Sequence, residues 1–176
     1  IEHGSSFEGA GGVAVFTEAK TRIHFEPATK RPIFEWRIIP TGYAFAGITL
    51  KGFTVRGFGP GASYCLDVTS AYGADIDFFA YAGVDTWIRM GHWITGKVKG
   101  GVQGFRSIGV EFYNVPAYGV SGVTTTTKID AYISGGPVAY SFADRSATNV
   151  KISGTVESVD SVLDQARGNS VDMDIF

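Results

Sequence analysis

The chain has 176 residues, a length that fits a single domain. It contains 17 Val and 14 Ile but only 3 Leu, together with 15 Thr and 24 Gly, and this composition favours strands and tight turns over helices. The formal net charge is −2 at neutral pH and basic residues form no long run, which argues against a nucleic-acid-binding protein. No apolar stretch approaches the roughly 18 residues that a membrane helix needs, so no transmembrane segment is expected.

The first predicted strand covers residues 13–25, where apolar side chains alternate with Glu18, Lys20 and Arg22. After a turn, a second strand is predicted over residues 34–38 and ends before Pro40. Turns that contain Gly or Pro then separate further predicted strands, at residues 43–50, 52–58, 63–69, 74–82 and 84–90.

The second half of the chain continues in the same way, with predicted strands at residues 93–98, 107–115, 123–133, 138–142 and 149–156. One helix is predicted over residues 159–167, because Val159, Val162, Leu163 and Ala166 have helical spacing and Ser158 can cap the first turn. Alternation in residues 171–175 predicts a last short strand.

About a dozen short strands with a turn every 8–12 residues are typical of a sandwich or a barrel. No internal sequence repeat is recognised. We therefore expect an all-β chain that forms one jelly-roll-like β-sandwich over residues 1–176, with one short C-terminal helix and a flexible N-terminal segment at residues 1–12.

Residues that could support catalysis do not form a recognised motif. His3, His24 and His92 lack the spacing of a zinc site, and no Ser lies in a GxSxG context. Cys65, between Tyr64 and Leu66, is expected to be a buried apolar residue rather than a nucleophile. The chain is therefore expected not to be an enzyme.

One segment keeps an enzymatic alternative open. Residues 110–119 resemble the nucleophile strand of small xylanases, and this resemblance implies a catalytic role for Glu111. The next candidate carboxylate, Glu157, lies only 46 positions further on and beside the predicted helix, which departs from the pattern of that family. A jelly-roll glycoside hydrolase is therefore a lesser alternative, as is an outer-membrane barrel.

Acidic residues suggest a metal site. The pairs Asp75 with Asp77 and Asp172 with Asp174 offer the hard oxygen ligands that Ca²⁺ prefers, although no known calcium-loop spacing organises them. Carboxylates on solvated strand faces are the alternative interpretation. Bound Ca²⁺ is the only cofactor that the sequence suggests.

Aromatic residues suggest a glycan ligand. Trp87, Trp93, Tyr113 and Tyr118 could form an exposed platform for sugar rings, whereas filling of a β-core is the simpler interpretation. A carbohydrate-binding module is therefore the main alternative function, and exposure of these rings would favour it.

The N-terminal segment suggests self-assembly. Phe7, Val13 and Val15 are apolar enough to need a groove, while the glycines around them keep the segment flexible. Such a strand can complete the sheet of the next copy of the chain, and repeated head-to-tail contacts of this kind build a homopolymer.

The whole-chain profile resembles extracellular strand-donating filament or tube subunits such as the cannula proteins of hot-living archaea. The features shared are a first residue other than Met, Gly and β-branched richness, acidic clusters, and only five Asn and Gln residues in all. This resemblance implies a secreted, non-enzymatic structural protein, stabilised by calcium, that assembles with copies of itself and comes from a thermophile.

Overall fold

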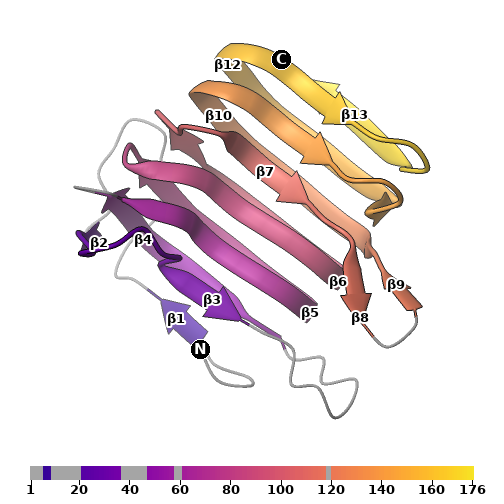
Figure 1. Cartoon of the computed structure of the whole chain (residues 1–176), viewed down its shortest axis with the longest axis horizontal. Helices are drawn as coiled ribbons and strands as arrows, with labels where there is room; N and C mark the ends of the chain where they lie inside the picture. Colours follow the sequence, from indigo (N-terminus) through magenta and orange to yellow (C-terminus); the bar gives the residue numbers. More distant parts are fainter. Residues whose placement is uncertain (1–5, 9–20, 37–46, 58–60, 118–119) are drawn as a thin grey trace.

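The structure, a computed structural model, describes residues 6–8, 21–36, 47–57, 61–117 and 120–176. Every regular element in these ranges is a β-strand, and the strands form a parallel β-solenoid of about five turns. In Figure 1 the strands follow one another from β1 and β3 at one end of the molecule to β12 and β13 at the other. The long strands curve round an edge, so that each contributes to two layers.

The strands differ widely in length. Four of them have 16 to 20 residues, namely β5 (Ala62–Tyr81), β6 (Val84–Gln103), β10 (Thr124–Phe142) and β12 (Val150–Gln165). The others are β1 (Ser6–Glu8), β2 (Thr21–Phe25), β3 (Phe34–Trp36), β4 (Thr49–Gly57), β7 (Ile108–Phe112), β8 (Val115–Ala117), β9 (Val120–Gly122), β11 (Ala147–Thr148) and β13 (Val171–Ile175).

The pairing of the short strands defines the two layers. β3 pairs with the N-terminal half of β5. β7 pairs with the N-terminal half of β6 and with the C-terminal half of β10. These strands form the front layer of Figure 1. β1, β2, β4 and β13 belong to the back layer, together with the remaining halves of the long strands. Each layer has one surface toward the core and one toward the outside.

The register reveals a structural repeat of about 22 residues. Because successive turns stack directly, residues one turn apart in the sequence lie side by side on neighbouring strands. Aligned pairs are Asp67 with Arg89, Ile88 with Val110, and Ile129 with Ile152. The repeat was missed in the sequence because few of its positions keep the same residue.

An insertion interrupts the repeat once. The antiparallel hairpin of β8 and β9 lies between β7 and β10, so Ile94 aligns with Thr125, 31 residues further on. The solenoid resumes its register beyond the hairpin, since β10 and β12 pair along both layers.

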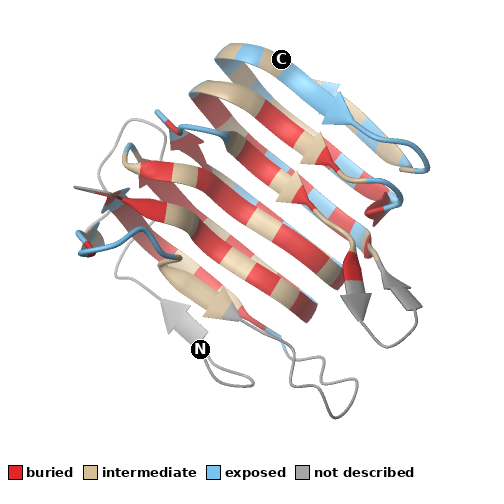
Figure 2. Ribbon diagram, viewed as in Figure 1, coloured by how far each residue is buried: buried red, intermediate tan, exposed pale blue. Residues whose placement is uncertain are grey.

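The core consists of apolar side chains stacked turn upon turn between the layers. Leu66, Ile88, Val110 and Tyr140 align in this way and are fully buried. The rings of Phe112 and Phe142 stack with centroids 4.2 Å apart. Figure 2 shows the buried residues concentrated in the middle turns and exposed ones in the last turn.

Left-handed backbone conformations stack at one corner of the solenoid. Gly73, Thr95, Thr126 and Asn149 occupy this corner in successive turns and have φ values of +68°, +54°, +51° and +53°. Such a residue turns the chain sharply between the layers without ending the strand ladder. The position tolerates Gly and Asn, but it strains a β-branched Thr.

The expected β-sandwich with a jelly-roll arrangement is wrong, although the all-β class is confirmed. Alternation of apolar and polar residues correctly indicated strands, but it does not show which strands pair. Successive strands were expected to form antiparallel hairpins, whereas within the described residues only β8 and β9 pair in that way.

The expected helix at residues 159–167 is also wrong, because β12 runs through Gln165. Val159 and Leu163 align with Gly136 and Tyr140 of β10, so tertiary pairing overrides the helical spacing of the apolar residues. Ser158 has a φ of +56° and forms a corner of the solenoid rather than a helix cap.

Candidate functional site

Three lysines align on the outer surface of the back layer. Lys97 of β6 pairs in register with Lys128 of β10, which pairs in register with Lys151 of β12. All three side chains are exposed. Neighbouring strands lie about 4.8 Å apart, so the three ammonium groups follow one another along the solenoid axis. We call these three residues the lysine column.

An aspartate stands at each end of the lysine column. Asp75 of β5 aligns with Lys97, and Asp172 of β13 aligns with Lys151. Asp75 also forms an ion pair with Lys51 of β4. The five aligned positions therefore read Asp, Lys, Lys, Lys and Asp over five consecutive strands.

A second column lies two residues further along each strand. It contains, in order of the strands, Asp77, Lys99, Asp130, Ser153 and Asp174. Partial burial is the main cause that raises the pKa of Asp77, while Lys99 and Lys51 act to lower it. Charges of both signs and one hydroxyl group thus run beside the lysine column.

A groove of about 390 Å³ lies over the lysine column and over the second column from Lys99 to Asp174. It extends from β6 to β13, and four of the seven lysines of the chain are among its lining residues. The charged and polar residues that line it are Lys97, Lys99, Lys128, Asp130, Lys151, Ser153, Asp172 and Asp174.

The lysine column is electrostatically unfavourable by itself. Two ammonium groups about 4–5 Å apart repel each other by about 1 kcal/mol in water, and like charges aligned on neighbouring strands destabilise a sheet. Within the described ranges, no carboxylate oxygen lies within 4 Å of the ammonium nitrogens of the column. The arrangement is suited to accept a ligand that carries several negative charges.

The expected calcium ligands fall into two separate places. Asp75 and Asp77 lie on β5, whereas Asp172 and Asp174 lie on β13, with β6, β10 and β12 between them. Among the residues that the structure describes, no three His, Cys, Asp or Glu side chains gather as they would around a metal ion. The pairs instead border a surface rich in lysine, and calcium binding stays a prediction.

The expected assembly strand is placed only in part. Phe7 lies in β1, which pairs parallel to β4 of the same chain with Phe7 opposite Leu50. Val13 and Val15 lie outside the described residues. This pairing shows β1 as part of its own sheet, and donation of the N-terminal segment to a neighbouring copy stays a prediction.

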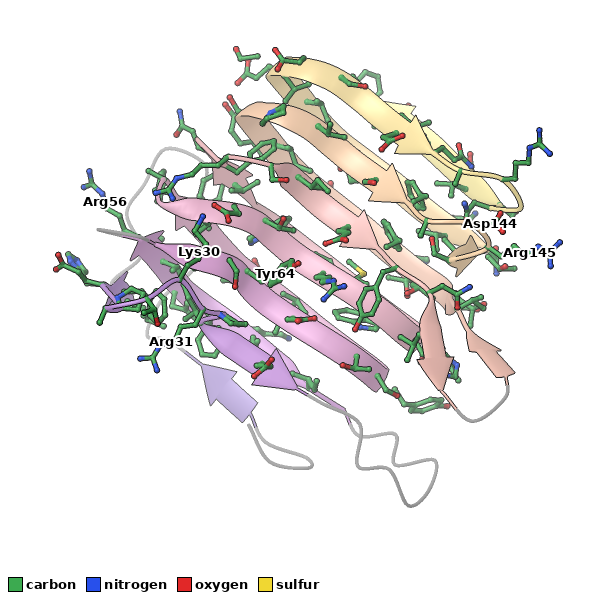
Figure 3. The ribbon with its side chains drawn as sticks, viewed as in Figure 1. Lys30, Arg31, Arg56, Tyr64, Asp144 and Arg145 are labelled. Carbon is green, nitrogen blue, oxygen red and sulfur yellow. The ribbon has the colours of Figure 1, made fainter. Side chains whose placement is uncertain are left out.

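The front layer carries a second charged cluster, centred on Arg89 of β6. Its Nη1 lies 3.5 Å from Oδ2 of Asp67, and its Nε lies 3.4 Å from Oε2 of Glu111. Its guanidinium carbon lies 5.1 Å from the ring centroid of Tyr64 and 3.9 Å from that of Tyr113. Figure 3 shows Tyr64 on this front layer.

The contacts of Arg89 indicate a structural role for this cluster. Two carboxylates and two aromatic rings already surround the guanidinium, so little of it is left to bind a ligand. Burial is the main cause that raises the pKa of Glu111, with a further contribution from Asp67, while Arg89 lowers it. Glu111 therefore serves to bind Arg89 here, and Glu157, on β12 in the back layer, is not near this cluster in register.

The expected sugar platform is not formed by the tryptophans. Trp87 and Trp93 are fully buried, and Nε1 of Trp93 donates a hydrogen bond to the carbonyl oxygen of Val68 at 3.2 Å. Tyr113 packs on Arg89, and Tyr118 lies outside the described residues. Cys65 is buried as expected, and burial raises the pKa of its thiol.

Sequence reasoning missed the lysine column, although the sequence contains a signal for it. A charged residue, an apolar residue and a second polar residue recur as a triplet once in each of five turns. The triplets are Asp75-Ile76-Asp77, Lys97-Val98-Lys99, Lys128-Ile129-Asp130, Lys151-Ile152-Ser153 and Asp172-Met173-Asp174.

Comparisons of the chain with protein-family models, curated protein sequences and solved structures find no match. Within the described part of the chain, no helix is long and apolar enough to cross a membrane.

Proposed function

We propose that this chain is a carbohydrate-binding solenoid whose lysine column binds an acidic polysaccharide. The observation that carries the proposal is the alignment of Lys97, Lys128 and Lys151 over a groove. A ligand with several carboxylates would offset the repulsion between these lysines. The proposal keeps the glycan ligand considered from the sequence, but it replaces the aromatic platform with a charged surface.

The second column favours a sugar chain over a more densely charged polymer. Asp130 and Asp174 would repel the closely spaced phosphates of a nucleic acid. The carboxylate of Asp130, with the hydroxyl of Ser153, can accept hydrogen bonds from sugar hydroxyl groups. A polysaccharide that alternates carboxylates with hydroxyl groups therefore fits both columns.

Isothermal titration calorimetry with polygalacturonate tests the proposal, with neutral dextran and duplex DNA as comparison polymers. Polygalacturonate should bind, and its affinity should fall as salt is added because exposed ion pairs are screened. Dextran and DNA should bind weakly or not at all. Equal affinity for dextran would assign the groove to neutral sugars, and preference for DNA would contradict the proposal.

Variants of the lysine column test whether these three lysines bind the polymer. Each of Lys97→Gln, Lys128→Gln and Lys151→Gln should weaken binding about two- to fivefold, which corresponds to about 0.4–1 kcal/mol for an exposed ion pair. Lys30→Gln is the matched control, because Lys30 is also an exposed lysine but lies at the front layer, where it forms an ion pair with Asp85 of β6. A triple variant with unchanged affinity would contradict the role of the column.

Self-assembly is a second proposal, and one observation favours it. Val162 and Leu163 of β12 are exposed apolar residues on the last described turn, and such a strand can pair with a second copy. Sedimentation velocity should then detect oligomers, and the double variant Val162→Lys with Leu163→Lys should abolish them. A chain that stays monomeric at all concentrations would contradict the proposal.

If acidic pairs on adjacent copies share Ca²⁺, a chelator should dissociate these oligomers.

A further inference from the structure

We propose that the binding site accepts three consecutive anionic groups and that Asp75 and Asp172 set this length. The inference rests on the proposed function, because it concerns the extent of the same lysine column. The column spans three strands, and the two aspartates occupy the same register position on the strands that flank it. The site is thus bounded by charge rather than by a wall.

A ligand that uses all three lysines must run along the solenoid axis. The lysines lie on β6, β10 and β12, so the direction from one to the next is perpendicular to the strands. The rise of about 4.8 Å per strand is close to the length of one sugar unit in an extended chain. The long, flexible side chain of lysine accommodates carboxylates that do not all point toward the sheet.

A fourth anionic group would meet a carboxylate of the protein at either end. Past β12 it would lie near Asp172 and Asp174, which both line the groove. Past β6 it would lie near Asp75, aligned with Lys97. Repulsion of this kind gives specificity by penalising the wrong ligand rather than by strengthening the right one.

The two ends of the lysine column should not limit the length of the ligand equally strongly. Lys51 pairs with Asp75 and partly neutralises it. Asp172 lies beyond 4 Å from every Lys and Arg nitrogen of the described residues, and Asp174 adds a second negative charge beside it. The β13 end therefore limits the ligand more strongly than the β5 end.

Titration of the full chain with oligogalacturonates of two to six units tests the inference. Affinity should rise from the dimer to the trimer and should not rise further for longer oligomers. Asp172→Asn should increase the affinity for the tetramer relative to the trimer about two- to fivefold, and Asp75→Asn should do so by less. Asp144→Asn is the control, because Asp144 is an exposed carboxylate at the turn after β10 and is not among the residues that line the groove.

The outcomes separate this inference from the proposed function. Affinity that rises steadily up to six units, with no effect of Asp172→Asn, would overturn the length limit while leaving polysaccharide binding intact. Absence of binding at every length would overturn the proposed function as well. Circular dichroism of each variant confirms that it is folded, and Asp174→Asn, expected to act in the same direction, provides an independent variant.

Discussion

Two threonines occupy backbone conformations that β-branched residues avoid. Thr95 and Thr126 have φ values of +54° and +51° at the stacked corner, where the next turn uses Asn149. A residue in this region costs about 1–2 kcal/mol when its Cβ is crowded, and Asn adopts the region more readily. Thr95→Asn and Thr126→Asn should therefore each raise the free energy of unfolding by about 0.5–1 kcal/mol. Thermal unfolding measures the change, and a lower midpoint for both variants would contradict the assignment of this corner.

Two glycines with positive φ should respond differently to alanine. A Cβ on Gly100, whose φ is +100°, would lie 2.0 Å from the carbonyl oxygen of Phe78, whereas a Cβ on Gly73 would meet nothing within 4 Å. Gly100→Ala should therefore destabilise the fold by more than about 3 kcal/mol, and Gly73→Ala by only about 1–2 kcal/mol. Urea unfolding of both variants compares them, and similar losses would argue against the strand stacking at Gly100.

Glu111 should make stability depend on pH. Burial raises its pKa above the ordinary value of 4.5, so between that value and the raised one the folded chain holds more protons than the unfolded chain. The contribution of Glu111 to stability is therefore present at lower pH and is lost as the pH rises through this window. Glu111→Gln should reduce this loss in urea unfolding from pH 4 to pH 7. An unchanged slope of stability against pH for Glu111→Gln would contradict this role of Glu111.

Among the strands, the lysine column is expected to serve ligand binding while it lowers the free energy of unfolding. Lys128 lies between Lys97 and Lys151, so Lys128→Glu would replace two repulsive neighbours with two attractive ones. The variant should raise the free energy of unfolding by about 0.5–2 kcal/mol at low salt, and added salt should reduce the gain. It should also weaken polygalacturonate binding more than Lys128→Gln does. A variant less stable than the original chain at low salt would show that the column is not strained.

Strand β12 shows how far the sequence predicts an element. The strand expected at residues 149–156 is confirmed from Val150 onward, and Val150 and Ile152, which alternate with polar residues in the sequence, are buried in the core. The following residues have helical spacing, but their conformation depends on pairing with β10, which lies more than 20 residues earlier. Local periodicity contains no information on such a partner, so the helix was predicted wrongly.

At the scale of the whole molecule, the strands were largely predictable and their arrangement was not. Val and Ile richness indicates β-structure whether successive strands form hairpins or successive turns stack in parallel. The solenoid can be recognised in the sequence only when five triplets are aligned, namely those around Ile76, Val98, Ile129, Ile152 and Met173. The number of residues between successive triplets is not constant, because the hairpin of β8 and β9 is inserted between the triplets around Val98 and Ile129.

The same reasoning explains why the candidate site was found only in part. Asp75, Asp77, Asp172 and Asp174 were selected for their charge, but their lysine neighbours come from other turns of the solenoid. Without the register, the acidic pairs suggested a metal site. With it, they border a lysine column, so the proposed role of limiting an anionic ligand stands beside the untested prediction that they bind Ca²⁺.

Nuclear magnetic resonance titration of the chain with trigalacturonate tests binding at the lysine column, because it locates the ligand residue by residue. We expect the chemical-shift changes to concentrate on Lys97, Lys128 and Lys151 and on their neighbours in the second column, and to saturate together with one affinity. Chemical-shift changes centred on Tyr64 and Arg89 of the front layer, with none in the lysine column, would contradict binding at the lysine column.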